Sequence, residues 1–444
     1  MGSQVAGMSR HETGQEVRGR FTYSVFASPL HDATTVNELT APVRARLDAL
    51  GGVLDETRPA GASHLYVVAT GGTERAILDA VTRRWAVDDE PCILVAHGGH
   101  NSLPAALEAL AAIRQRGGRG RIVALTGRGG PDTDTDIDTD RLDEAIVDLD
   151  AIRRFHTTRL GVVGGPSSWL VASSPDPAVV RRRWGVEIVT VDPTRAIELT
   201  RVPVVPTGVL AQRFTRVADP VRSTVDVQAV DTAMGVRAAL TDAIDDHDLD
   251  AVTVRCFDLL DDPGTSGCLA LASLNDDGVV AGCEGDVPSA LAMLVVRNLL
   301  GQPSWMANPA MVDPEANRLV LAHCTVAPSM LDHFSLDTHF ESGRGVGISG
   351  VFASQPVTLL RVGGADLDEH WIVEGDIVST GDDPDLCRTQ VTVELTTGRV
   401  DDLLERPLGN HVVLAAGHHG DRLRRWWELA VEGRDEPPRE LDRI

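Results

Sequence analysis

The chain has 444 residues, of which 65 are acidic and 41 basic, and its net charge is −24. This length favours two or three domains, and a hydrophobic content of 43% lets each of them bury a core. Every basic residue is arginine, because the sequence contains no lysine, and this excludes a Schiff-base lysine, a pyridoxal phosphate anchor and the lysine of a P-loop. The strong negative charge also disfavours nucleic acid and membrane surfaces as partners.

Other features are typical of a soluble, cytoplasmic protein. The sequence has no apolar run of about 18 residues, and Met1–Gln4 is not followed by the apolar block of a signal peptide. The six cysteines are scattered and form no Cys-x-x-Cys pair, which argues against a disulfide framework or a structural zinc site. The acidic excess, with arginine in place of lysine, predicts a salt-adapted, halophilic source, although codon bias alone would also explain the arginines.

Strand-like and helix-like stretches alternate in the N-terminal part of the chain. We expect a flexible N-terminal tail over residues 1–20 and a first Rossmann-like α/β domain over residues 21–156. Its clearest helix is expected over Leu103–Arg114, with Asn101 or Ser102 as the capping residue. Buried strands are expected at residues 64–69, 92–96 and 121–125.

The rest of the chain predicts two further domains. The acidic segment Asp132–Asp140 lacks the central glycine and closing glutamate of a calcium loop, so we expect a solvated surface loop. A second α/β domain carrying Glu284 is expected over residues 157–330. From residue 331 the strand-like runs alternate apolar and polar residues or are rich in β-branched residues, and turn residues separate them. This pattern predicts a β-rich C-terminal domain over 331–444 with a final helix. The expected fold class is α/β, with two Rossmann-like parallel-sheet domains followed by this β-rich domain.

Gly-rich turns follow two strands of the first domain, at Thr70–Glu74 and His97–Ser102. Ligands of open α/β sheets bind at such strand ends, but tight turns need glycine in any case, so both explanations stay open. His97 and His100 have a spacing that suits one metal ion, yet no carboxylate lies near them, and we expect hydrogen-bonded or surface histidines. The segment Gly343–Gly350 leads into a strand-like run and lacks lysine, which predicts a turn and a strand rather than a nucleotide loop.

The densest group of chemically useful side chains begins at Glu284 and Asp286. Both follow a strand-like run and precede a long apolar helix, where the helix N-terminus favours ionised carboxylates. Asn308 and His323 come next, near a further strand, and His411 precedes the strand-like run 412–416. A capping carboxylate, an Asn-Pro turn and core histidines would explain each residue singly. Their recurrence at successive strand ends favours a functional site.

The order of these motifs resembles the active-site order of the L-fucose and L-arabinose isomerase superfamily. The resemblance spans roughly residues 60–425 and includes motifs of the first two domains. The matching segments are Gly71–Glu74, Asn101–Glu108, Gly164–Ser167, Gly282–Asp286, Gly301–Asn308, Leu321–Cys324 and Asn410–His411. Such a resemblance implies two Rossmann-like domains followed by a β-rich domain, and interconversion of aldoses and ketoses through an enediol. This chemistry needs a base and a divalent ion, typically manganese (Mn2+), to stabilise the developing charge.

The resemblance also assigns roles. It implies that Glu284 binds the metal and exchanges the proton, and that His323 and His411 are metal ligands, with His418 as a neighbouring candidate for the place of His411. Asn308 falls where the fucose-type enzymes carry a catalytic, metal-binding aspartate, and an amide can be neither a base nor an anionic ligand. Asp286 would supply the missing carboxylate if its loop folds back. Asn101, Ser102, Arg344 and His418 are further candidates for substrate contacts.

The predicted function is therefore an isomerase of sugars or sugar derivatives. A carbon–carbon lyase or epimerase on the same scaffold is the alternative, as is a noncatalytic sugar-binding protein. Arg344, near His339 and Glu341, would hold a phosphate or carboxylate of the substrate, and a salt-bridged turn is the other explanation. The resemblance finally implies a homo-oligomer, a trimer or hexamer, in which first-domain residues of one subunit complete a neighbour's site.

Overall fold

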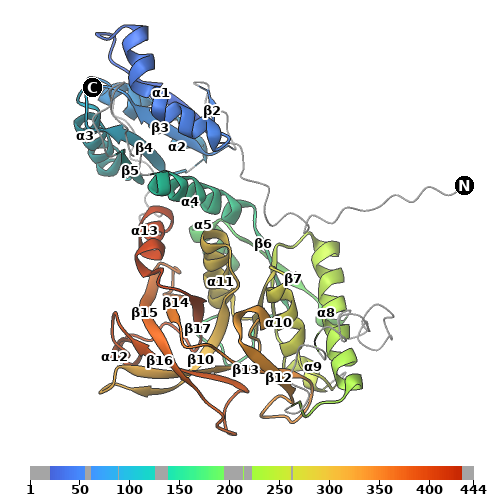
Figure 1. The fold of residues 1–444 in the computed structure, drawn as a ribbon. Coiled ribbons are helices and arrows are strands. Elements are labelled where there is room, and N and C mark those ends of the chain that lie inside the picture. The colour runs from blue at the N-terminus through green and yellow to red at the C-terminus, as the bar shows by residue number, and fades with distance from the viewer. Residues whose placement is uncertain are drawn as a thin grey trace, which may run out of the picture. The chain divides into compact units, whose positions relative to one another are not determined.

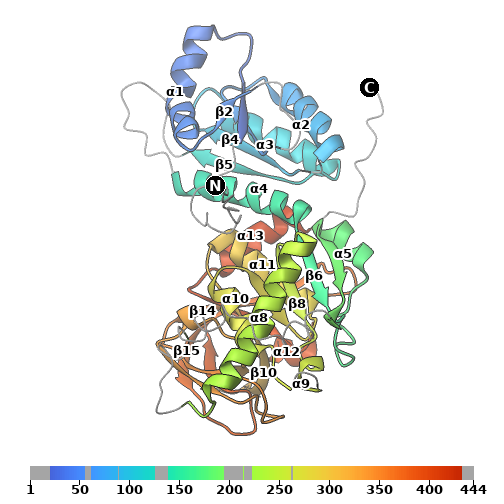
Figure 2. The ribbon, with the colours of Figure 1, turned by 90° about the vertical axis from the view of Figure 1, so that its right-hand side faces the viewer.

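The structure is a computed structural model that describes residues 21–55, 62–88, 90–125, 139–194, 214, 223–261 and 264–432. The chain divides into two compact units, one of residues 1–153 with 426–444 and the other of residues 154–425. Their elements are labelled in Figure 1 and drawn from a second direction in Figure 2. The expected tail over residues 1–20 and the acidic segment up to residue 138 lie outside the described residues.

The first unit is built on a five-stranded sheet with the order β2-β1-β3-β4-β5, in which every paired strand is parallel. All residues of β3 and β4 are buried, because helices cover both faces of a sheet with such crossovers. The elements are β1 (Thr22–Phe26), α1 (Ala33–Ala49), β2 (Val53–Leu54), β3 (His64–Val68), α2 (Glu74–Asp88), β4 (Cys92–His97), α3 (Ser102–Gln115) and β5 (Gly120–Leu125). Helix α4 (Thr139–Thr157) follows in sequence.

The turn between β4 and α3 is held by His97 and Ser102. The Ser102 hydroxyl accepts a hydrogen bond from the His97 backbone N–H at 3.0 Å and donates one to the Val68 carbonyl. The His97 ring lies 2.9 Å from the Ala69 carbonyl, and its Nδ1 accepts from the Gly99 N–H at 3.1 Å. The expected hydrogen-bonded histidine is therefore confirmed for His97. Asn101 stands at the N-cap position, but the expected side-chain cap is not formed there.

The second unit begins with a four-stranded parallel sheet of order β7-β6-β8-β9. Its strands are short and apolar, and helices connect them. The elements are β6 (Arg159–Val163), α5 (Pro177–Trp184), β7 (Glu187–Val191), α8 (Val227–His247), β8 (Ala251–Val254), α9 (Asp258–Asp261), α10 (Cys268–Asp276), β9 (Val280–Cys283) and α11 (Val287–Leu300). Helix α8 runs beside this sheet and packs against α10 (Figure 2).

A closed antiparallel barrel of order β10-β11-β16-β15-β14-β17 completes the second unit. Its interior and the adjoining hairpin β12–β13 share one apolar core, which includes Trp305, Leu321 and Leu414. The elements are β10 (Trp305–Asp313), β11 (Arg318–His323), η2 (Pro328–Met330), β12 (His333–Asp337), β13 (Gly347–Val351), β14 (Pro356–Gly363), β15 (Glu369–Thr380), β16 (Thr389–Leu395), α12 (Asp401–Glu405) and β17 (Val412–Ala416). A last helix, α13 (Gly420–Ala430), follows.

Helix α11 joins the parallel sheet to the barrel. It packs against β8 and β9 on one side and against β14 and β17 on the other, which explains why almost every residue in it is buried (Figure 1). A helix that is apolar all round is expected only in such a position. The helix begins at Asp286, the N-cap, whose carboxylate accepts from the Ser289 N–H at 2.7 Å.

The predicted fold class is confirmed: two parallel α/β sheets are followed by a β-rich region and a final helix. The barrel includes β10 and β11, which precede residue 331, so the β-rich region begins earlier than the sequence texture indicates. The segment Gly343–Gly350 forms the expected turn and strand, with positive φ at Gly343 and Gly345. None of the described helices combines the length and apolarity needed to cross a lipid bilayer.

Candidate active site

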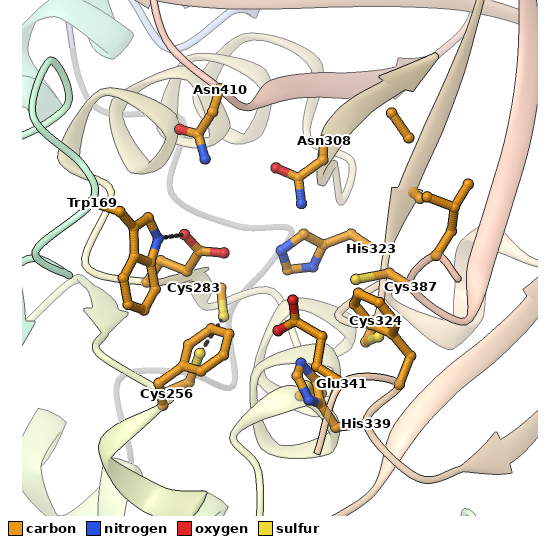
Figure 3. Close-up of a pocket in the computed structure, with 17 residues that line it drawn as sticks. Trp169, Cys256, Cys283, Asn308, His323, Cys324, His339, Glu341, Cys387 and Asn410 are labelled. Carbon is orange, nitrogen blue, oxygen red and sulfur yellow. Dashed lines mark hydrogen bonds between the residues drawn. The ribbon is translucent and has the colours of Figure 1, made fainter. Parts of the chain in front are cut away.

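A cavity of about 420 Å³ lies in the second unit, between the carboxyl ends of β8 and β9 and the barrel strands β10 and β11 (Figure 3). Glu284, Asn308 and His323 all line it. The sheet and the barrel thus bring together three of the residues that the sequence singled out. Ligands commonly bind outside the carboxyl ends of parallel strands, so the position agrees with the general rule for such sheets.

A tight turn after β9 places Glu284 in this cavity. Glu284 and Gly285 both have positive φ values, of 61° and 75°. A Cβ on Gly285 would lie 2.5 Å from the Gly165 carbonyl oxygen and 2.6 Å from Pro166 Cα, so only glycine fits. A left-handed glutamate is uncommon and is found mainly where function requires it. The side chain is 11% exposed, so its carboxylate is largely removed from solvent.

The two oxygens of the Glu284 carboxylate have different partners. Oε2 accepts a hydrogen bond of 2.6 Å from the indole Nε1–H of Trp169 (Figure 3). Oε1 lies 3.5 Å from His411 Nε2. Burial raises the pKa of Glu284, but the nearby charge of His411 and the hydrogen bond from Trp169 outweigh burial and lower the pKa overall. Glu284 is therefore ionised at neutral pH.

His411 is fully buried beside two carboxylates. Its Nδ1 lies 2.9 Å from Asp286 Oδ2, whereas Nε2 has no hydrogen-bond partner among the described residues. Burial lowers the pKa of His411, but the hydrogen bond with Asp286 and the negative charges of Asp286 and Glu284 prevail and raise the pKa to about 9. A buried imidazole nitrogen without a partner, aimed at a carboxylate, is the arrangement of a metal ligand whose other nitrogen is held by a carboxylate.

Asp286 lies behind His411. Its Oδ1 accepts from the Ser289 N–H, and its Oδ2 accepts from Arg361 Nη1 at 3.2 Å and faces His411. Burial raises the pKa of Asp286, but the Arg361 charge and the His411 contact lower it well below its usual range. The loop does not fold back into the position of a missing ligand, because both oxygens are already occupied. Asp286 does not line the cavity and contacts His411 instead.

His323 completes the group at the end of β11. Its Nδ1 lies 3.0 Å from the Thr325 hydroxyl, and its ring centroid is 5.7 Å from that of His411. Burial and the charge of His411 lower the pKa of His323 to about 3, so this imidazole is neutral. One donor atom each from Glu284, His323 and His411 lies within 4.8 Å of the others. This is the only such group of three or more among the residues that the structure describes.

These three residues fit a divalent ion. One carboxylate oxygen and two imidazole nitrogens form a donor set that suits first-row divalent metals, and the partnerless His411 Nε2 is directed at the shared position. Asn308 belongs to β10, where it lies opposite Ala322 of β11, and its side chain points into the same cavity (Figure 3). Its amide oxygen is neutral, so it offers a weaker ligand than the carboxylate expected at that place.

The other predicted residues lie elsewhere. Arg344 does not line the cavity, and its Nη1 donates to the Leu260 carbonyl at 3.0 Å. His418 is likewise absent from the lining and lies 3.2 Å from the Gly375 carbonyl. Asn101 and Ser102 belong to the first unit and remain candidates for substrate contacts on the basis of the resemblance alone.

Two aromatic residues that line the cavity, Trp169 and Phe257, were not predicted as part of the site. Glu341 and His339, which the sequence placed near Arg344, line it as well, and Figure 3 shows the Glu341 carboxylate pointing into it. The motif Gly164–Ser167 ends two residues before Trp169 and was the one available signal for it. Five of the six cysteines also line the cavity, although they are scattered in the sequence: Cys256, Cys268, Cys283, Cys324 and Cys387. All of them are free thiols, and the sulfurs of Cys256 and Cys283 are 2.7 Å apart.

Several curated proteins are similar to this chain. No family model matches the chain. The sulfoquinovose isomerase of Alkalicoccus urumqiensis is 24% identical over 225 residues, which cover 48% of this chain and 50% of that protein. The chain is similar to sugar isomerases. The sulfoquinovose isomerase of Priestia megaterium is 28% identical over 169 residues, or 36% of this chain and 37% of that protein.

A third relative has the same name. The sulfoquinovose isomerase of a Clostridium species is 32% identical over 133 residues, which are 28% of this chain and 29% of that protein. The matched segments thus span about half, or less, of the length of these curated relatives. Similarity of this extent indicates a relationship with isomerases of a sugar, but does not fix the substrate of this chain.

Proposed function

We propose that this protein is an aldose–ketose isomerase that acts on a sugar or a sugar derivative through a metal-stabilised enediol. The observation that carries the proposal is the group of Glu284, His323 and His411, whose donor atoms lie within 4.8 Å of one another. Two of these residues, Glu284 and His323, line a cavity large enough for a monosaccharide. The relatives named sulfoquinovose isomerase support the same reaction class and make sulfoquinovose the first substrate to test.

Each residue of the site would have a different chemical role. Glu284 is an ionised, largely buried carboxylate, and it would take the proton from the carbon next to the carbonyl and return it to the neighbouring carbon. Glu284, His323 and His411 would hold the ion, with Asn308 as a neutral ligand. When bound, a divalent ion such as Mn2+ supplies Lewis acidity that stabilises the negative charge on the substrate oxygens. Asp286 accepts a hydrogen bond from His411 Nδ1, so Nε2 is the nitrogen that would offer its lone pair to an ion once its proton is displaced.

Asn308 is the observation that favours the second candidate. If the site has one carboxylate fewer than an isomerase needs, epimerisation or a carbon–carbon cleavage would use the same enolate stabilisation. A noncatalytic sugar-binding protein would need neither the ion nor the ionised Glu284. Deuterium uptake distinguishes these reactions, because isomerisation and epimerisation in D2O label the product at different carbons, and a binding protein labels nothing.

The test of the proposal is metal content together with turnover. We expect the purified protein to bind close to one equivalent of Mn2+ and to convert sulfoquinovose or a related aldose to the ketose, with NMR as the readout. Chelation is expected to abolish turnover, and added Mn2+ to restore it. Turnover that survives complete chelation would contradict the metal-dependent mechanism. A protein that binds sugar equally well with and without the ion, and converts none, would be a binding protein.

Ion binding is expected to depend steeply on pH, because the ion must displace the proton from His411 Nε2. The pKa of His411 is raised to about 9, so the ion-free protein keeps this proton at neutral pH and loses it as the pH rises through that value. The apparent Mn2+ affinity should therefore increase by about tenfold per pH unit from about pH 7 towards pH 9. Calorimetric titrations at several pH values measure this slope. A flat profile would mean that His411 does not bind the ion.

The oligomeric state is part of the proposal as well. The resemblance implies a trimer or hexamer in which Asn101 or Ser102 of one subunit reaches the substrate of another. Sedimentation at several protein concentrations would measure the assembly.

A further inference from the structure

The loop after β6 contacts Glu284 at two points. The Ser167 N–H donates to the Glu284 backbone carbonyl at 2.8 Å, and Trp169 Nε1–H donates to Oε2 of the carboxylate at 2.6 Å. Gly285 packs directly against Gly165 and Pro166 of the same loop. The loop thus fixes both the backbone and the side chain of the residue on which the proposed chemistry depends.

The Trp169 ring itself belongs to a row of aromatic side chains. Its ring lies edge to face against Phe257, with centroids 4.9 Å apart at 84°, and Phe257 lies edge to face against His339 at 5.5 Å. All three residues line the cavity. Trp169 is nevertheless 49% exposed, which is unusual for an indole whose N–H is engaged at a buried carboxylate. The indole therefore has one edge committed to Glu284 and apolar surface left open at the cavity.

A carboxylate rotates freely about its last torsion unless its oxygens are held, because that torsion has broad minima. In this site only Oε2 has a hydrogen bond, and that bond leaves Oε1 directed at His411 Nε2, 3.5 Å away. Without the indole N–H, either oxygen could turn towards His411, and the carboxylate would have to be ordered again each time an ion binds. Outer groups that orient a metal ligand typically contribute about 10- to 100-fold in affinity or activity.

We propose that Trp169 is a positioning residue for Glu284 and, through its exposed ring, part of the surface that receives the apolar face of the sugar. This inference rests on the proposed function, because it assumes that Glu284 binds the ion and moves the proton. Trp169 would then have two roles that can be tested separately. The N–H group acts on Glu284 and hence on ion affinity and kcat, whereas the ring acts on the substrate and hence on KM.

Substitution separates the two parts. Trp169→Phe keeps an aromatic ring and removes the N–H, so we expect Mn2+ affinity or kcat to fall by about 10- to 100-fold while KM changes little. Trp169→Ala removes both and should also raise KM. The matched control is Trp371→Phe, since Trp371 is a buried tryptophan of β15 whose indole N–H has no partner among the described residues. That variant should keep the native ion affinity and kcat.

The hydrogen bond can be observed without any turnover. The chain has seven tryptophans, and the indole N–H resonance that disappears in Trp169→Phe belongs to Trp169. We expect this resonance to lie downfield in the native protein, to move upfield in Glu284→Gln, and to shift when a diamagnetic divalent ion such as Mg2+ is added. If the chemical shift of this resonance were the same in Glu284→Gln as in the native protein, the inference would be overturned. A Trp169→Phe variant with native Mn2+ affinity and kcat would also overturn it. If the native protein bound no ion and converted no sugar, the proposed function would fail instead, and the positioning role would fail with it.

Discussion

Replacing Glu284 by glutamine is expected to reduce kcat for the isomerised sugar by about 1000-fold, within the 100- to 10,000-fold range that a positioned acid–base group contributes. Glutamine has nearly the same shape, but its amide can neither take the proton nor present an anionic ligand. The protein should still fold, because the amide oxygen can accept the hydrogen bond from Trp169 Nε1–H. Mn2+ binding should weaken in parallel, as calorimetry would show.

The control for this variant is Glu394→Gln. Glu394 is a half-exposed residue of β16 that pairs with Arg318 on the barrel surface, so its carboxylate takes no part in the cavity. This variant should retain native kcat and native Mn2+ affinity. Full turnover by Glu284→Gln on the true substrate would show that another group carries the proton, and Glu341 would then be the first candidate, since its carboxylate points into the same cavity.

Replacing Arg361 by methionine is expected to lower the free energy of unfolding by about 3–5 kcal/mol, the usual cost of removing one partner of a buried ion pair. Arg361 is 1% exposed and lies behind the site. Its guanidinium donates to Asp286, to the hydroxyls of Ser289 and Ser173, and to the Leu408 carbonyl. Without Arg361 the buried Asp286 loses its compensating charge, and His411 loses a fixed partner. Urea unfolding, monitored by circular dichroism, measures the change.

Arg318→Met is the matched control for Arg361→Met. Arg318 also pairs with a carboxylate, but both side chains are close to half exposed, so the pair contributes only about 0–1 kcal/mol. The two variants thus remove the same chemical group from an exposed and a buried pair. Equal stability of the two variants would contradict the structural role of Arg361. The double variant Asp286→Asn with Arg361→Met should recover part of the loss, because no unpaired charge then stays buried.

Much of the fold was predictable because buried parallel strands are continuous apolar runs. The runs at His64–Val68 and Cys92–His97 are fully buried strands, as expected. Strand β10 was harder to predict, because its second half is only partly buried and its Asn308-Pro309 step reads locally as a turn. Only the pairing of β10 with β11 and β17 keeps that segment extended, and such pairing is not visible in a local pattern.

In the site, too, the local sequence indicates some residues, whereas contacts between distant residues could not be predicted from it. Glu284, His323 and His411 each stand at or next to the end of a strand, which marked them as candidates, and the resemblance then implied their role as ligands. The position of Asp286 behind His411 depends on contact with Arg361, 75 residues later, and the partner of Glu284 Oε2 is Trp169, 115 residues earlier. No local pattern fixes contacts of that length. The resemblance placed the ligands, but it did not reveal the groups that hold them.

The origin of the three proposed ligands has a mechanical consequence. Glu284 extends from the parallel sheet, whereas His323 and His411 belong to the barrel, so an ion held by all three would act as a cross-link between two separately paired sheets. A ligand that binds only the folded state stabilises it by about 2.7 kcal/mol at 100 times its dissociation constant. The melting temperature should therefore rise with ion concentration, and in chelator the junction between sheet and barrel should become the first place where a protease can cut.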